Sequence, residues 1–197
     1  MMFWFIPLVI FLAVAIFSPG PNNVIAMSVG FNYGFKRVIP HLLAVVVGFS
    51  IMLFVVGIGI KELILKYQSA FEVMKYLCSF YLLYLAYKIA TSKPNLNTNE
   101  AKPITFKESL LFQVINPKSW IAALSIVTIY LPKDNFLAAL FITIIISDIL
   151  IVLAISTWAV LGKSFNKIFK SEKTTKIFNF SMAILLVVSV LMILFVE

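Results

Sequence analysis

Two proline-containing segments hold the residues whose types and spacing could do chemistry. One is Ser-Pro-Gly-Pro-Asn-Asn, which comprises Ser18, Pro19, Gly20, Pro21, Asn22 and Asn23. The other comprises Asn116, Pro117 and Lys118. Each interrupts a long apolar run, at about residues 3–30 and 108–131, because proline and glycine both disfavour a continuous helix. Irregular backbone inside a bilayer is tolerated only where it is buried in protein or lines a cavity, so the two segments predict a shared polar site.

The second segment predicts a site for an anion. Asparagine is a favoured N-cap and proline a favoured first helical residue, so a half-helix is expected to start at Asn116-Pro117. Its free N–H groups and the positive end of its dipole attract negative charge. Lys118 adds a cation that is costly inside a membrane unless it is compensated. The compensating group would be a substrate carboxylate or Asp148, the acid in the middle of the fifth apolar run.

Several of these residues have more than one interpretation. Asp148 could form a salt bridge with Lys118 that only joins helices, or it could couple transport to protons or bind a substrate ammonium. Lys118 could instead extend to a membrane interface. The first proline segment could be a kink that only packs against its neighbours. His41, the single histidine, is expected to be an interfacial packing residue rather than a proton relay.

The composition predicts an integral membrane protein. Of the 197 residues, 62% are hydrophobic and 12% are charged, whereas soluble domains are about half apolar and a quarter charged. The net charge of +8 is typical of lysines retained in cytoplasmic loops, and no nucleic-acid partner is expected. Cys78 is the only cysteine, so no disulfide or thiol pair can form within the chain. No metal site and no cofactor are predicted.

The hydrophobic pattern predicts an all-α protein with six transmembrane helices. They are expected at about residues 3–30, 38–60, 71–90, 107–131, 136–161 and 177–196. One transmembrane domain, residues 1–197, would contain a first three-helix repeat (1–91), a polar linker (92–106) and a second repeat (107–197). Because helices 1 and 4 are interrupted at matching places and each half has an odd number of spans, the halves are expected to form a 3+3 inverted repeat.

The distribution of basic residues predicts the orientation in the membrane. Loops after the first, third and fifth helices hold Lys36, Arg37, Lys88, Lys93, Lys102, Lys107, Lys163, Lys167, Lys170, Lys173 and Lys176. The opposite side holds Lys61, Lys66, Lys75 and Lys133. The positive-inside rule therefore places the first set in the cytoplasm and both termini outside a bacterial inner membrane. The glycines of Gly30-x-x-x-Gly34 permit a close helix contact in a homodimer.

The motifs resemble those of the LysE/RhtB amino-acid exporters. The similar segments are Ser18-Pro19-Gly20-Pro21-Asn22, Asn116-Pro117-Lys118, Gly48 with Gly57, Tyr81-Leu82-Leu83-Tyr84-Leu85, and Asp148. The resemblance implies a six-helix inner-membrane transporter that exports amino acids or their derivatives, driven by the proton gradient. Ala86 departs from the family pattern, where a glycine often follows the tyrosine motif.

These observations lead to one expected function and two alternatives. The expected function is proton-coupled export of an amino acid by alternating access. The substrate carboxylate would meet the half-helix N-termini and Lys118, and its ammonium would meet Asp148 or the carbonyls freed by Pro19 and Pro21. The alternatives are an exporter of another small solute or metal ion, and a membrane-embedded enzyme. An enzyme is not expected, because the chain has no Gly-x-Ser-x-Gly motif and His41 is the only candidate base.

Overall fold

The predicted all-α architecture is confirmed. The computed structural model describes residues 4–60, 68–91, 103–168 and 171–194, and every regular element in these ranges is helical. Within them, three helices are long and apolar enough to cross a membrane, and two bent pairs raise this to as many as five spans. The helix α5 (Gln68–Ala90) is not among them, because Lys75, Lys88 and several tyrosines lower its hydropathy. The six predicted spans are therefore only partly matched.

Both predicted interruptions are present. The first apolar run forms α1 (Phe5–Phe17) and α2 (Pro21–Tyr33), which are bent by 48° relative to each other. The second forms α6 (Phe106–Ile115) and α7 (Pro117–Ser125), with a bend of 59°. In both cases proline is the first residue of the second half-helix, where its missing N–H removes no intrahelical bond.

The other helices complete the bundle. A turn of 3-10 helix, η1 (Phe35–Val38), leads into α3 (Ile39–Val55), which ends in a π-helical turn, η2 (Val56–Ile60). A second π-helical turn, η3 (Ile126–Tyr130), continues α7. The chain then forms α8 (Phe136–Ile168) and α9 (Glu172–Leu194).

Two predicted helix boundaries were wrong. The helix α8 continues to Ile168 instead of ending near residue 161, because Phe165 of its last turns packs near Phe178 with ring centroids 6.2 Å apart. The helix α9 begins at Glu172 instead of residue 177. Ser171 accepts a hydrogen bond from the Thr174 N–H at 3.1 Å, as an N-cap does. The polar residues at the described ends of α8 and α9 thus belong to the helices and not to the predicted loop.

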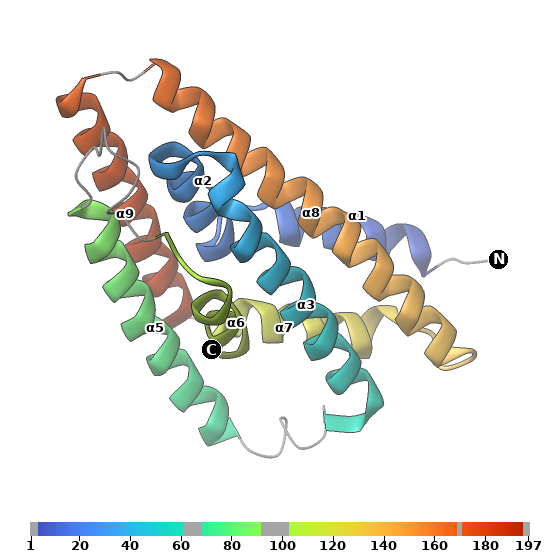
Figure 1. Cartoon of the computed structure of the whole chain (residues 1–197). Helices are drawn as coiled ribbons and strands as arrows, with labels where there is room; N and C mark the ends of the chain where they lie inside the picture. Colours follow the sequence, from blue (N-terminus) through green and yellow to red (C-terminus); the bar gives the residue numbers. More distant parts are fainter. Residues whose placement is uncertain (1–3, 61–67, 92–102, 169–170, 195–197) are drawn as a thin grey trace.

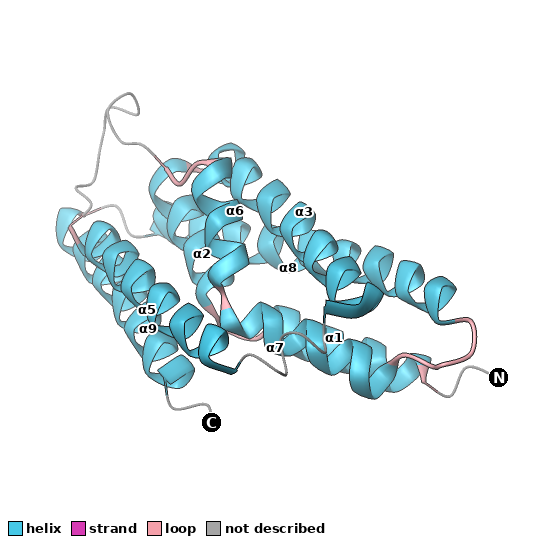
Figure 2. Ribbon diagram, turned by 90° about the horizontal axis from the view of Figure 1, so that it is seen from below, coloured by secondary structure: helices cyan, strands magenta, loops and turns pink. Residues whose placement is uncertain are grey.

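The helices are arranged so that the two bent pairs meet in the middle of the molecule. The long helices α3 and α8 pack against each other (Figure 1). The first bent pair packs on α8, and the second pair packs on α3. The remaining helices, α5 and α9, lie side by side at one edge of the bundle, as both ribbon views show (Figures 1 and 2).

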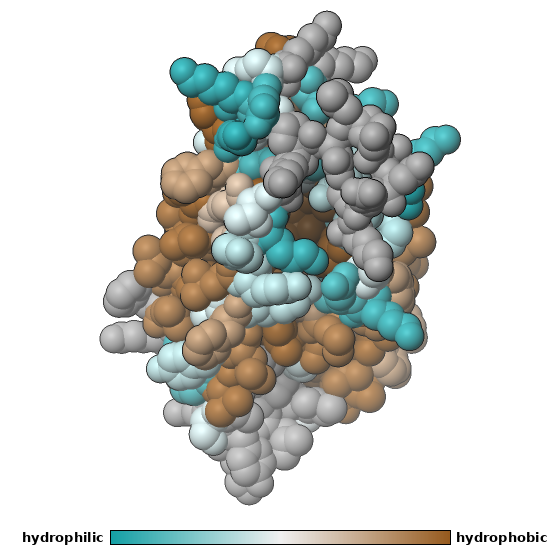
Figure 3. All heavy atoms as spheres, turned by 60° about the vertical axis from the view of Figure 1, so that its left-hand side comes forward, coloured by the Kyte–Doolittle hydropathy of each residue, from teal (hydrophilic) through white to brown (hydrophobic). Residues whose placement is uncertain are grey.

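The outer surface of the bundle is apolar, as expected for helices in lipid. On α1 the residues Ile6, Ile10 and Val14 follow one another at four-residue spacing and are each at least 60% exposed. Such a stripe would be unfavourable in water. On the face shown in Figure 3, hydrophobic side chains cover much of the surface, while hydrophilic side chains gather toward the upper end and around a hollow.

Two glycines allow α2 and α8 to pack closely. A Cβ atom at Gly30 would overlap the carbonyl group of Ala159, and one at Gly162 would overlap the carbonyl oxygen of Met27. The absence of both side chains lets the two backbones approach, as is common between membrane helices. Gly30 is buried in this contact, whereas a Cβ atom at Gly34 would meet nothing within 4 Å, so only the first glycine of the Gly30-x-x-x-Gly34 motif packs within the chain. The contact holds the second half of the first bent helix in place.

We expect Gly30→Ala to lower the thermal stability of the purified protein in detergent. The added methyl group forces α2 away from α8, at a cost of about 1–3 kcal/mol. Ser164→Ala, on an exposed position of α8, is the control and should leave the unfolding temperature near that of the wild type. Equal unfolding temperatures for Gly30→Ala and Ser164→Ala would show that the α2–α8 contact is looser than described.

Candidate functional site

A cavity of about 260 Å³ lies where the two bent helices meet. Its polar lining comes mainly from the two breaks and consists of Asn22, Asn23, Gln113, Asn116, Lys118, Ser119 and Ser125. Its apolar lining comes from α1, α3, α7 and α8 and consists of Phe11, Leu12, Ala15, Ile16, Val45, Phe49, Ile121, Ala122, Ile151 and Ile155. Gly20 and Pro21 complete the wall. The sequence prediction that the two proline segments share one site is consistent with this placement.

At the first break, side-chain donors form hydrogen bonds with the carbonyl groups that the prolines leave without a backbone donor. Because Pro19 and Pro21 have no N–H, the carbonyls of Ala15 and Phe17 lose their usual helical donors. The Ala15 carbonyl accepts a bond from Ser18 Oγ at 3.0 Å, and the Phe17 carbonyl accepts one from Trp158 Nε1 of α8 at 3.3 Å. Each freed carbonyl therefore has a side-chain donor.

Asn23 supplies two further bonds to the same break. Its Nδ2 donates to the carbonyl of Ile16 at 2.8 Å and to that of Ser18 at 2.9 Å. The side chain is 4% exposed. Since a bilayer offers no water to these carbonyls, Asn23 stabilises the broken conformation directly.

The N-termini of two half-helices face the cavity. At α7, Asn116 Oδ1 accepts a bond from the Lys118 N–H at 3.2 Å, so this N-terminus is capped as predicted. At α2 the N-cap is Gly20, which offers no side-chain acceptor. Its first-turn N–H groups have no intrahelical acceptor, and they lie at a wall of the cavity. Such an uncapped helix end is suited to bind an anion.

Lys118 brings a positive charge to the same place. Its Nζ donates to Ser18 Oγ at 2.9 Å, which joins the two breaks. A Cβ atom at Gly20 would lie 2.8 Å from this Nζ, so the glycine leaves room for the ammonium. The side chain is half-buried and lines the cavity.

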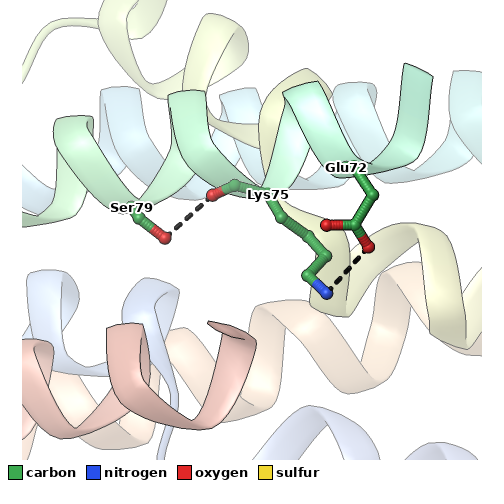
Figure 4. A network of polar contacts seen from close by, with 3 residues as sticks. All are labelled: Glu72, Lys75 and Ser79. Carbon is green, nitrogen blue, oxygen red and sulfur yellow. Dashed lines mark hydrogen bonds and ion pairs between the residues drawn. The ribbon is translucent and has the colours of Figure 1, made fainter. Parts of the chain in front are cut away.

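Lys118 has no acidic partner among the described residues. The ion pairs found there are Lys75 with Glu72 and Lys176 with Glu172. Lys75 shows how a buried lysine is usually compensated, since its Nζ lies 3.0 Å from Glu72 Oε1 (Figure 4). The hypothesis of a structural salt bridge between Lys118 and Asp148 is therefore wrong in this conformation.

A buried polar network connects the two breaks further. Asn22 Nδ2 donates to Gln113 Oε1 at 3.0 Å, and Gln113 Nε2 donates to Ser119 Oγ at 2.9 Å. Gly48 of α3 makes space for this network, since a Cβ atom there would lie 2.8 Å from Gln113 Cγ. In contrast, Asn22 Oδ1 is buried and has no hydrogen-bond partner. Gln113 is a site residue that was not predicted from the sequence, although a glutamine inside an apolar run three residues before Asn116 is a visible signal.

His41 extends the network away from the cavity. It is fully buried, with Nδ1 3.0 Å from Ser109 Oγ of α6 and Nε2 3.1 Å from the carbonyl oxygen of Asn22. His41 therefore packs inside the protein and not on its outer surface. Both ring nitrogens have partners, so His41 connects α3 to α6 and to the first turn of α2.

Asp148 lies outside the cavity lining. Its Oδ1 is 2.7 Å from Ser50 Oγ of α3, which also lies 2.8 Å from the carbonyl oxygen of Val46. Ile151, one helical turn further along α8, does line the cavity. The structure thus places Asp148 at the α3–α8 contact outside the cavity lining, whereas Lys118 is a lining residue.

These features define a helical membrane protein with an internal site between two broken helices. A comparison with known protein families shows that the chain belongs to the LysE type translocator family, whose sequence model matches residues 13–195.

The curated relatives are named as efflux proteins. A "Cysteine/O-acetylserine efflux protein" of Escherichia coli K12 is 30% identical over 157 residues, which cover 78% of this chain and 79% of the relative. The protein of the same name from Shigella flexneri serotype 5b matches to the same extent, and that of Escherichia coli O1:K1 is 29% identical. No solved structure gave a significant match.

We expect Asn23→Leu to lower the thermal stability of the protein more than the loss of a polar group at an exposed position does. The substitution keeps the size of the side chain but leaves two carbonyls of the first break without this donor, at about 1–3 kcal/mol. Thermal unfolding in detergent measures the effect. Thr128→Val is the control, because the exposed Thr128 hydroxyl bonds only to the Leu124 carbonyl of its own helix. If both variants unfold at the same temperature, Asn23 does not stabilise the break.

Proposed function

We propose that this protein exports amino acids or amino-acid derivatives from the cytoplasm, as the names of its relatives suggest. The observation that carries the proposal is the ammonium of Lys118. It lies at a cavity of amino-acid size, beside the uncapped N-terminus of α2, and has no acidic partner among the described residues.

The α-carboxylate of the substrate supplies the missing negative charge. A buried ammonium without a counter-ion is costly, and a bound carboxylate removes this cost by forming a charge-assisted hydrogen bond. The N–H groups at the start of α2 and the positive end of its dipole add to the attraction. Binding of a substrate carboxylate therefore lowers the free energy of the site.

The ammonium of the substrate meets Asn22. Each carbonyl freed by Pro19 and Pro21 already accepts a side-chain donor, and Asp148 does not line the cavity. Asn22 lines the cavity, and its buried Oδ1 has no donor among the described residues. This assignment replaces the expected contacts of the ammonium with Asp148 or with the free carbonyls.

Asp148 couples export to the proton gradient. A carboxyl group at the contact of two long helices is suited to this role, because its protonation changes the interaction between them. Ser50 on α3 is its partner. Proton binding at Asp148 and substrate binding at Lys118 would then favour different arrangements of α3 and α8.

The six-helix inverted repeat accounts for the packing of the bundle. The first bent pair packs on α8 as the second packs on α3, while α3 packs on α8 and α5 on α9. The same contacts result when each helix of the first half is exchanged for its counterpart in the second half, that is, the first bent pair for the second, α3 for α8 and α5 for α9. This symmetry supports repeats 1–91 and 107–197 within a single domain. With the lysine-rich loops in the cytoplasm, both termini lie outside the bacterial inner membrane.

Export by the Lys118→Met variant tests the proposal. Cells loaded with dipeptides accumulate single amino acids, whose efflux is then followed. The loss of a charge-assisted bond worth about 1.5–3 kcal/mol predicts a reduction of about ten- to hundredfold in the efflux rate at low internal substrate. Lys133→Met, at an exposed turn, is the control. Wild-type rates in Lys118→Met would contradict the assigned site.

Proton coupling is tested separately with Asp148→Asn. In cells expressing the wild type, a protonophore should abolish concentrative efflux. In the variant, efflux should be slow and insensitive to the protonophore, because the amide cannot bind and release a proton. Asp134→Asn, in the exposed turn before α8, should behave like the wild type. A protonophore effect of wild-type size in Asp148→Asn would exclude Asp148 as the coupling group.

A further inference from the structure

We propose that the substrate is a neutral amino acid with an apolar side chain, of the size of leucine or methionine. The inference rests on the proposed function and adds the side-chain class to it. The inference is based on the part of the cavity beyond the two helix breaks, which the amino and carboxyl groups of the substrate do not fill.

The cavity has a polar end and an apolar end. The polar groups cluster at the breaks, where Ser18, Lys118 and the first turn of α2 meet. From there α7 continues for five residues, about 7 Å, to Ala122, which lines the cavity. On α1 the lining continues in the opposite chain direction to Phe11. A substrate held at the breaks by its α-carboxylate therefore extends its side chain between α1 and α7.

The walls around that side chain are apolar. They include Phe11 and Leu12 of α1, Phe49 of α3, and Ile151 and Ile155 of α8. Ser125 on α7 is the one polar lining residue of the described chain beyond the breaks. Apolar walls favour an apolar side chain, since burying an unpaired polar group costs free energy.

The charges of the lining exclude charged side chains. Lys118 is the one ionisable residue among the described lining residues. A lysine or arginine substrate would find no carboxylate there, because Asp148 is bonded to Ser50 outside the lining. A glutamate substrate would bring two carboxylates to a single cation. Both would leave a charge without a partner in a site of low dielectric constant.

The size of the cavity fits a single amino acid. Its volume of about 260 Å³ is just below the range of about 300–1,000 Å³ for drug-sized ligands. The cysteine and O-acetylserine in the names of the relatives are likewise neutral. The apolar walls of this chain therefore point to leucine or methionine as better-fitting substrates than serine.

Efflux from proteoliposomes tests this inference. The purified protein is reconstituted, and vesicles are loaded separately with radiolabelled leucine, methionine, serine, lysine or glutamate. We expect leucine and methionine to leave about tenfold faster than lysine and glutamate, and faster than serine. Protein-free vesicles give the background rate.

Two variants test where the side chain lies. Ala122→Phe on α7 and Ala15→Leu on α1 both narrow the apolar end. Each should lower the ratio of leucine to serine efflux about tenfold. Ala138→Phe, at an exposed position of α8, should keep the wild-type ratio. Because a ratio is measured, partial loss of folded protein does not imitate the effect.

The outcomes separate this inference from the proposed function. Lysine or glutamate efflux as fast as that of leucine would overturn the neutral class while amino-acid export remained. Unchanged leucine-to-serine ratios in both variants would overturn the placement of the side chain. No efflux of any of the five amino acids above background would overturn the proposed function and the inference with it.

Discussion

The structure depends on how polar backbone groups at two helix breaks find partners without water. At the first break, Ser18 and Trp158 donate to the carbonyls of Ala15 and Phe17 that Pro19 and Pro21 set free, and Asn23 donates to the carbonyls of Ile16 and Ser18. At the second, Asn116 caps α7. Trp158 of α8 supplies one of the donors to the first break, and the bonds of Lys118 to Ser18 and of Asn22 to Gln113 join the two breaks, so each break is stabilised by its neighbours. The bent helices and the helices around them therefore form one cooperative unit.

The same arrangement concentrates positive potential at one place. The N-termini of α2 and α7 face the cavity, and Lys118 lies between the breaks with Ser18 as its hydrogen-bond partner. A site with excess positive charge in a medium of low dielectric constant favours an anionic group. The carboxylate is the one group common to all amino acids, so the polar end can recognise the class while the apolar end selects the side chain.

The sequence predicted what local chemistry determines. Proline and glycine marked both breaks, and Asn116-Pro117 identified the start of α7, because these preferences act over a few residues. It could not predict that Lys118 bonds to Ser18, one hundred residues away, or that Asp148 lies outside the cavity. In a membrane helix that is apolar on all sides, periodicity does not reveal the inward face. For the same reason the sequence does not reveal that His41 is fully buried.

The boundaries of the last two helices failed for a different reason. Lysines and serines at the ends of α8 and α9 lower hydropathy, but they do not end a helix. The apolar contact of Phe165 with Phe178 and the Ser171 cap keep these polar segments helical. Hydropathy thus indicates which part of a helix lies in the lipid, whereas capping residues indicate where the helix itself begins or ends.

Equilibrium binding of an amino acid and of its carboxamide tests the central claim most directly. The compound with the fastest efflux is titrated, with its amide, against wild-type and Lys118→Met protein in lipid nanodiscs. The account predicts that the wild type binds the acid about tenfold or more tightly than the amide, and that Lys118→Met removes this difference. Equal binding of acid and amide by the wild type would contradict a carboxylate site at Lys118.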